Sequence, residues 1–256
     1  MNPAGLRVVV TGGASGIGLA FARRLRELGS RVAIVDRDVA ALAAVGEEWP
    51  RAAPASSGEC VAWEGDVGIE ADVTRVVEGV VASFGGIDVL INNAAVLRDQ
   101  ALVSKLGKRV KKHSTADWDE TLRSNLTGPF LMAREVAASM IERRLAGLVV
   151  NVSSISRAGN PGQTAYAASK AALVAMTATW AQELAPHRIR VVAIAPGFVE
   201  TGMTKAIPPM FLERIRELTP LKRFGTLDEF ASAIQFVVEN DYLNGKTLEL
   251  DGGLRF

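Results

Sequence analysis

Short runs of β-branched and other apolar residues alternate along the chain with longer segments in which apolar residues recur at helical spacing. Each run is four to six residues long with few polar positions, which is typical of strands buried on both faces of a sheet. The seven runs are RVVV ending at Val10, RVAIV ending at Val35, CVAWE from Cys60, DVLIN ending at Asn92, LVVNV ending at Val152, RVVAIA ending at Ala195 and KTLEL ending at Leu250. The alternation predicts an α/β fold with a parallel seven-stranded sheet and helices on both faces.

The segment after the first run shows the helical pattern. Ile17, Phe21, Leu25 and Leu28 recur at helical spacing, and Gly29 is a typical helix stop. No linker or fixed-period repeat interrupts the alternation, and 256 residues suit one α/β unit. We therefore predict a single domain over residues 1–256.

Composition narrows the class of protein. A net charge of +1 with 48% hydrophobic residues argues against a disordered tail and a strongly basic nucleic-acid binder. One cysteine and two histidines argue against a disulfide framework and a histidine/cysteine zinc site, so we expect no metal. No apolar run approaches the roughly 20 residues of a membrane span, and the first residues lack a secretory signal. We expect a cytoplasmic protein without nucleic-acid or membrane partners.

The first predicted strand leads directly into the glycine-rich sequence TGGASGIG, and a predicted helix follows at once. Gly12, Gly16 and Gly18 are spaced as GxxxGxG, a variant of the dinucleotide-binding fingerprint in the strand–turn–helix context that it requires. Glycines allow the tight turn and let the backbone approach a pyrophosphate at the helix N-terminus. Taken alone, the motif is also consistent with a plain glycine-rich turn.

A carboxylate ends the second predicted strand. Asp36 lies 18 residues beyond Gly18, where it can accept hydrogen bonds from both hydroxyls of an adenosine ribose and repel a 2′-phosphate. The alternative is that Asp36 only caps the next helix. The glycine turn before it makes this interpretation weaker than ribose binding. We predict NAD as the cofactor, while NADP stays open because Arg37 could turn toward a 2′-phosphate.

Further motifs follow in a fixed order. They are Asp66–Val67, NNAA at Asn92–Ala95, Asn125 in SNLTG, NVSS at Asn151–Ser154, YAASK at Tyr166–Lys170 and PGFVET at Pro196–Thr201. With the glycine turn they resemble the short-chain dehydrogenase/reductase family, from Val8 to the end of the chain. The chain is most similar to β-ketoacyl-carrier-protein reductase-like and 3-hydroxyacyl-CoA dehydrogenase-like members. The resemblance implies a Rossmann-type, doubly wound fold and hydride transfer with a nicotinamide cofactor. Ala95 departs from the family, which usually has glycine there.

Tyr166 and Lys170 are four residues apart and share one face of a predicted helix. An ammonium group within about 4–6 Å favours tyrosinate and lowers a pKa that starts near 10. Tyr166 is therefore a candidate general base for alcohol oxidation and general acid for carbonyl reduction. The resemblance implies that Lys170 also holds the nicotinamide ribose, whereas the pair alone could be an amphipathic surface pair.

A serine at the end of the fifth predicted strand would hydrogen-bond the substrate oxygen, and Ser153 and Ser154 compete for this role. Neighbouring strand residues point to opposite faces, so only one can serve. We predict Ser154, the last residue of the family pattern, because a change in the following loop is easier to accommodate than a register shift. The commonest serine-to-tyrosine spacing in the family would instead select Ser153. The resemblance assigns Asn125 a water that links the lysine to solvent.

The resemblance also assigns the remaining cofactor contacts. They are the turn residues Gly12, Ser15, Gly16, Ile17 and Gly18, the adenosine-side residues Asp66, Val67 and Asn93, and the nicotinamide-side residues Val199 and Thr201.

Two less regular segments bear on the substrate. Residues 201–221 match the family's substrate lid, and their apolar residues Met203, Ile207, Met210, Phe211 and Leu218 imply an apolar substrate portion; an ordinary helical hairpin is the alternative. Residues 104–113, SKLGKRVKKH, carry five cations and no acid and look like an insertion. We expect a solvated loop or hairpin there, or a docking site for an anionic carrier, either coenzyme A or an acidic acyl-carrier protein.

These expectations describe an NAD(H)-dependent oxidoreductase that interconverts a secondary alcohol and a ketone. A 3-hydroxyacyl/3-oxoacyl thioester leads as substrate because of Gln163, the apolar lid with Met203 and the basic insertion. A cyclic or aromatic substrate, such as a hydroxysteroid, cyclohexanol or quinone, is the alternative. A non-catalytic dinucleotide sensor is a second alternative, against which the set Asn125, Ser154, Tyr166 and Lys170 argues. The resemblance further implies a homotetramer.

Overall fold

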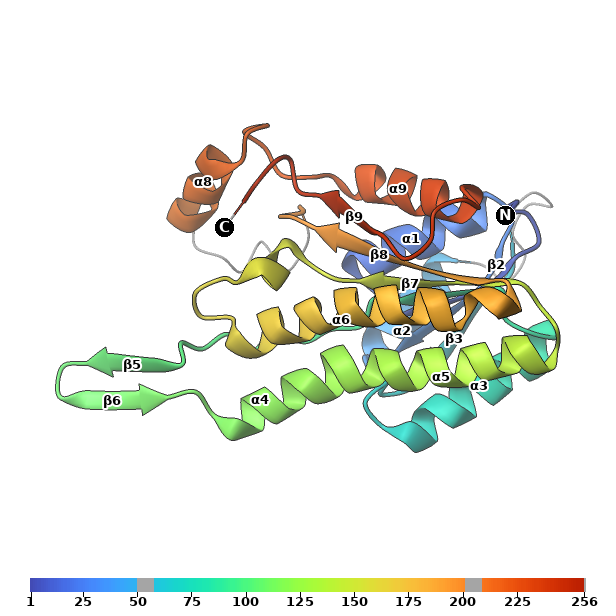
Figure 1. Ribbon diagram of the computed structural model, residues 1–256, viewed down its shortest axis with the longest axis horizontal. Coiled ribbons are helices and arrows are strands. Elements are labelled where there is room, and N and C mark those ends of the chain that lie inside the picture. The colour runs from blue at the N-terminus through green and yellow to red at the C-terminus, as the bar shows by residue number, and fades with distance from the viewer. Residues whose placement is uncertain (50–57, 201–208, 256) are drawn as a thin grey trace.

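The structure is a computed structural model, and it describes residues 1–49, 58–200 and 209–255. At its centre is a sheet of seven parallel strands in the order β3-β2-β1-β4-β7-β8-β9 (Figure 1). The strands are β1 (Arg7–Thr11), β2 (Arg31–Asp36), β3 (Cys60–Glu64), β4 (Val89–Asn92), β7 (Gly147–Val152), β8 (Ile189–Pro196) and β9 (Thr247–Leu250). All seven apolar runs form strands, so the predicted Rossmann-type sheet is confirmed.

Helices cover both faces of the sheet. One layer consists of α1 (Gly16–Glu27), α2 (Val39–Glu48) and α9 (Leu227–Glu239). The opposite layer contains α3 (Glu70–Phe84), α5 (Gly128–Glu142) and α6 (Thr164–Glu183). Two further α-helices in the described residues are α4 (Thr115–Leu122), which leads into α5, and α8 (Pro209–Leu218), which lies beyond the carboxyl ends of the strands (Figure 1). No helix in the described ranges is both long and apolar enough to cross a membrane.

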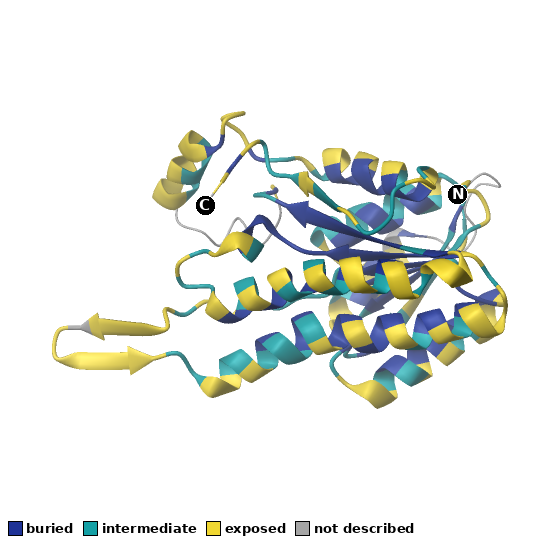
Figure 2. Cartoon of the chain, viewed as in Figure 1, coloured by how far each residue is buried: buried dark blue, intermediate teal, exposed yellow. Residues whose placement is uncertain are grey.

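The continuous apolar character of the strands follows from this layering. In β1, Val8 and Val10 pack into the core beneath α1 and α9, whereas Val9 packs into the core beneath α3 and α5. Successive strand side chains point to opposite faces, and both faces here are covered. Figure 2 shows the central strands buried and the outer helix faces exposed.

The strand order also determines where a ligand can bind. The chain leaves β1 to form β2 and β3 on one side, then returns to form β4 on the other side of β1. Helices that follow these strands lie on opposite faces, which leaves a crevice outside the carboxyl ends of β1 and β4.

The basic segment forms a hairpin that projects from the body of the protein (Figure 1). Strands β5 (Val103–Leu106) and β6 (Arg109–Lys112) are antiparallel and pair Leu106 with Arg109. The two-residue turn begins with Gly107 at φ +60°, a backbone conformation that glycine adopts without strain. Of the two structural expectations for this segment, loop or hairpin, the hairpin is confirmed.

Candidate active site

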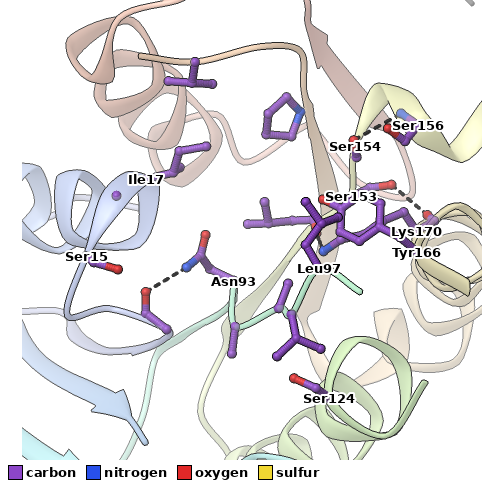
Figure 3. Close-up of a pocket in the computed structure, with 18 of the residues that line it drawn as sticks. Ser15, Ile17, Asn93, Leu97, Ser124, Ser153, Ser154, Ser156, Tyr166 and Lys170 are labelled. Carbon is purple, nitrogen blue, oxygen red and sulfur yellow. Dashed lines mark hydrogen bonds between the residues drawn. The ribbon is translucent and has the colours of Figure 1, made fainter. Parts of the chain in front are cut away.

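A cavity of about 800 Å³ lies at the carboxyl ends of the strands (Figure 3). Thirteen residues predicted as site residues line it: Gly12, Ser15, Gly16, Ile17, Asp36, Asp66, Val67, Asn93, Ser154, Gln163, Tyr166, Lys170 and Val199. Two others, Gly18 and Asn125, lie behind the cavity wall rather than on it. Thr201 and Met203 lie outside the described residues. Segments from both halves of the chain thus meet around one space.

The glycine turn between β1 and α1 forms one end of the cavity. A Cβ atom on Gly18 would lie 2.3 Å from the carbonyl oxygen of Gly12, and one on Gly12 would lie 2.8 Å from the Cα of Ala94. The glycines are therefore required by the close approach of three backbone segments. Ser15 caps α1 without a side-chain hydrogen bond, and the first turn holds no acid. The helix N-terminus can therefore face an anionic group.

Asn93, directly after β4, holds this turn in place. Its amide nitrogen donates hydrogen bonds to the carbonyl oxygens of Thr11 at 3.1 Å and Gly12 at 2.9 Å. The side chain points toward the turn in Figure 3. Asn93 would therefore influence dinucleotide binding indirectly, by fixing the shape of the glycine turn.

Asp36 ends β2 at the far side of the turn. One carboxylate oxygen accepts a hydrogen bond from the backbone nitrogen of Ala14 at 3.2 Å, and the other accepts one from that of Asp38 at 3.1 Å. The carboxylate is oriented by the backbone and still borders the cavity. Each oxygen can accept further hydrogen bonds, as two ribose hydroxyls would require.

Arg37 belongs to a network of alternating charges beside Asp36. Its guanidinium lies 3.2 Å from a carboxylate oxygen of Glu120 and 4.0 Å from one of Asp66. Arg123 reaches the same two acids at 2.8 and 3.0 Å, and its hydrogen bond is the main reason that the pKa of Glu120 is lowered. Two cations therefore share two carboxylates. The sequence offered no spacing signal for Arg123, which lies 57 residues from Asp66.

Tyr166 and Lys170, on α6, form the opposite end of the cavity with Ser154. The Lys170 ammonium is 5.5 Å from the centre of the Tyr166 ring and donates a 2.7 Å hydrogen bond to the carbonyl oxygen of Val152. Figure 3 shows the serine, tyrosine and lysine side chains gathered at this end. The helical spacing of four residues thus places both side chains of α6 at the end of β7.

The two serines after β7 differ in what their hydroxyl groups contact. Ser153 donates a 2.7 Å hydrogen bond to the carbonyl oxygen of Lys170. Ser154 hydrogen-bonds Tyr166, and its oxygen also accepts from the backbone nitrogen of Ser156 at 3.1 Å. The Ser153 hydroxyl is thus hydrogen-bonded to the backbone of α6, and Ser154 is the serine whose hydroxyl contacts the tyrosine.

Burial dominates the ionisation of the tyrosine and the lysine. Loss of hydration raises the pKa of Tyr166 to about 12, against a lowering by its hydrogen bond with Ser154 and a further raising by Asp99. Burial lowers the pKa of Lys170 to about 8. The expectation of a lowered tyrosine pKa is wrong for this state, because desolvation outweighs the hydrogen bond with Ser154. Tyr166 is therefore a protonated phenol at neutral pH.

Asn125 lies where α4 and α5 join through a π-helical turn, Arg123–Thr127. The helix is therefore irregular directly before Gly128. The Asn125 side chain is fully buried; its oxygen accepts from the backbone nitrogen of Val96 at 2.7 Å and its nitrogen donates to the Val96 oxygen at 2.9 Å. Asn125 thus positions the loop that forms a cavity wall, and its role in holding a water stays a prediction.

Polar side chains border the cavity next to Tyr166. Gln163 accepts a 2.9 Å hydrogen bond from Asn160 and donates one of 2.8 Å to Asp99. Burial raises the pKa of Asp99, while the hydrogen bond from Gln163 lowers it. Asp99 and Asn160 belong to no motif in the sequence, so only their contacts with Gln163 identify them.

The helix α8 contributes an apolar wall. Phe211 and Ile215, one helical turn apart, line the cavity. Met210 and Leu218, which were also predicted to belong to an apolar lid, are 75% and 60% exposed and do not line the cavity. Met210 lies on a different face of α8 from Phe211, whereas Leu218 shares the face of Phe211 and Ile215 but ends the helix beyond the cavity lining.

Comparison with known proteins agrees with this geometry. The sequence model of a family described as short chain dehydrogenase matches residues 7–210. A 3-oxoacyl-(acyl-carrier-protein) reductase of Thermotoga maritima is 41% identical over 249 residues, which is 96% of each chain. A protein of the same name from Aquifex aeolicus is 34% identical with the same coverage. A (3R)-3-hydroxyacyl-CoA dehydrogenase of Canis lupus familiaris is 35% identical over 255 residues, covering 96% of this chain and 95% of its own.

Proposed function

Because the chain belongs to the short-chain dehydrogenase family, a family of nicotinamide-dependent oxidoreductases, we propose that it interconverts a 3-oxoacyl and a 3-hydroxyacyl thioester with NAD(H). The observation that carries the proposal is the grouping of Ser154, Tyr166 and Lys170 at one end of a cavity whose other end is the glycine turn. The relatives' names point to the same pair of substrates.

The proposed chemistry follows from the state of the three side chains. A bound nicotinamide dinucleotide supplies the hydride. Tyr166 donates its phenolic proton to the carbonyl oxygen of the substrate, while the Ser154 hydroxyl hydrogen-bonds that oxygen as charge develops on it. The Lys170 ammonium, 5.5 Å from the tyrosine ring, stabilises the phenolate that remains. The raised pKa keeps Tyr166 protonated at neutral pH, which is the form that can donate a proton to a carbonyl oxygen.

Two features support NAD rather than NADP. The Asp36 carboxylate borders the cavity at the end of β2, where it would repel a 2′-phosphate. Arg37 is already beside Glu120 and Asp66, so its charge is matched within the protein. The close backbone packing around Gly12 and Gly18 likewise fits a pyrophosphate at the start of α1.

The lining near Tyr166 supports an acyl substrate. Leu97, Phe198, Phe211 and Ile215 offer apolar surface to an acyl chain. Gln163 and Asp99 add amide and carboxylate groups at the rim, where the polar thioester portion would pass. A homotetramer stays a prediction, supported by exposed apolar residues such as Phe130 on α5 and Phe236 on α9.

The test is an initial-rate assay of nicotinamide absorbance. NADH and NADPH are each combined with acetoacetyl-CoA, a cyclic ketone and a quinone, and Tyr166→Phe is assayed alongside. We expect NADH-dependent reduction of the thioester and a loss of at least about 100-fold in kcat for Tyr166→Phe. Turnover of only the cyclic substrates would overturn the thioester assignment, and turnover with NADPH alone would overturn NAD. An active Tyr166→Phe would overturn the mechanism.

A further inference from the structure

The projecting hairpin of residues 103–112, here called the basic hairpin, concentrates positive charge on an exposed element. Its cations are Lys105, Lys108, Arg109, Lys111 and Lys112, and all are exposed. Within the part of the chain that the structure describes, none of them forms an ion pair. The segment holds no acid, so its charge is available to a partner.

Apolar side chains accompany these charges. Leu102, Val103 and Val110 are 69%, 57% and 60% exposed. The pairing register places Val103 and Val110 on the same face as Lys105 and Lys112. An isolated two-stranded hairpin is marginally stable in water, and apolar residues interleaved with cations are suited to a protein interface.

The base of the basic hairpin is fixed beside the cavity. Leu97 and Asp99, directly before it, line the cavity, and the backbone of Gln100 bridges to that of Gln163. The Gln100 side chain hydrogen-bonds Asp117 in α4. With strands of four residues at about 3.4 Å each, the tip extends roughly 14 Å beyond this base. A partner on the hairpin would therefore lie next to the mouth of the cavity.

We propose that the basic hairpin docks an acidic acyl-carrier protein, which delivers its thioester to the cavity; this inference rests on the proposed function. The cations lie on both faces and at the turn, so they suit an extended acidic surface better than the few phosphates of coenzyme A. The exposed valines can make apolar contacts with the surface of a carrier protein, whereas the phosphates of coenzyme A cannot make such contacts. Pairing with the same hairpin of a second copy would bring five cations against five, which is repulsive.

The test compares two double charge reversals. Lys108→Glu/Lys111→Glu changes the hairpin, and Arg143→Glu/Lys246→Glu is the matched control. Arg143 and Lys246 are exposed residues that precede β7 and β9, so they lie near the amino ends of the strands, opposite the cavity. Reduction of acetoacetyl-acyl-carrier protein, acetoacetyl-CoA and the uncharged acetoacetyl-N-acetylcysteamine is measured for each protein. Affinity for carrier protein bearing only its pantetheine arm is measured by calorimetry.

We expect the hairpin variant to raise KM for the carrier-bound substrate about tenfold and to weaken calorimetric binding by a similar factor. Its kcat and its KM for the N-acetylcysteamine thioester should stay unchanged, and the control variant should behave as wild type. Added salt should raise the carrier KM of wild type more than that of the hairpin variant.

Three results would overturn the docking proposal. They are an unchanged carrier KM in the hairpin variant, an equal rise in KM for all three substrates, and a loss of oligomeric mass by light scattering confined to the hairpin variant. The last would identify the hairpin as a contact between copies. If wild type reduces none of the thioesters, the proposed function fails, and calorimetry still decides whether the carrier docks.

Discussion

Replacing Lys170 with methionine should stabilise the folded chain at neutral pH while abolishing carbonyl reduction. Lys170 is 2% exposed, and burial lowers its pKa from 10.5 to about 8. One pKa unit corresponds to about 1.36 kcal/mol, so keeping the ammonium charged costs the fold about 3 kcal/mol below pH 8. Methionine removes this cost but leaves the Val152 carbonyl oxygen without the lysine donor, at about 1–3 kcal/mol. The net gain should be up to about 2 kcal/mol.

The pH dependence identifies the cause of this gain. A lysine whose pKa is lower in the folded state destabilises the fold below that pKa, and the cost disappears as pH rises from about 8 to 10.5. The advantage of Lys170→Met over wild type should therefore shrink by about 1 kcal/mol between pH 7 and pH 9. Burial also raises the pKa of Cys60 and of Tyr166 to about 12 each. Both groups are present in both proteins, so their contributions cancel in the difference.

Urea unfolding curves at pH 7, 8 and 9, at one protein concentration, measure this difference. Lys170→Arg is the control, because it keeps a buried charge throughout this range and should be no more stable than wild type at pH 7. A stability difference between Lys170→Met and wild type that stays constant from pH 7 to pH 9 would refute the reasoning. It would mean that the buried ammonium is hydrated well enough to keep its ordinary pKa.

Two further predictions concern the ends of the cavity. Asp36→Ala should raise KM for NADH about tenfold and erode the preference for NADH over NADPH in initial-rate assays; an unchanged preference would show that the ribose-binding carboxylate lies elsewhere. Ser154→Ala should lower kcat about 100-fold. Ser153→Ala should keep kcat within a few fold and lower the free energy of unfolding by about 1 kcal/mol, because it loses the hydrogen bond to the Lys170 carbonyl. The opposite pattern of effects would identify Ser153 as the serine that meets the substrate.

The strands and the glycine turn could be predicted because local sequence dictates them. A strand covered on both faces must be apolar at every position, as Val8, Val9 and Val10 are. The turn requires glycine at positions 12 and 18 because neighbouring backbone leaves no space for a Cβ. Such requirements act on single positions, so they can be recognised along the chain.

Other properties of the site arise only where distant segments meet. The pairing of Arg123 with Asp66 and that of Gln163 with Asp99 join residues 57 and 64 positions apart. The pKa of Tyr166 depends on how much water its hydroxyl loses, which the spacing to Lys170 does not encode. Residue spacing could predict that the two side chains share a helix face, but not that burial would dominate their ionisation.

The anchoring of the basic hairpin has a consequence for how this part of the chain can vary. Its two ends are joined by a hydrogen bond between the backbone nitrogen of His113 and the Leu102 oxygen, at 3.0 Å. Before it, the loop is held by Asn125 through Val96; after it, the Ser114 side chain caps α4. Because the ends are already together, changing the length between them adds little loop-closure entropy. The hairpin can therefore be shortened, extended or exchanged for another sequence while the sheet and the side chains of Ser154, Tyr166 and Lys170 keep their positions.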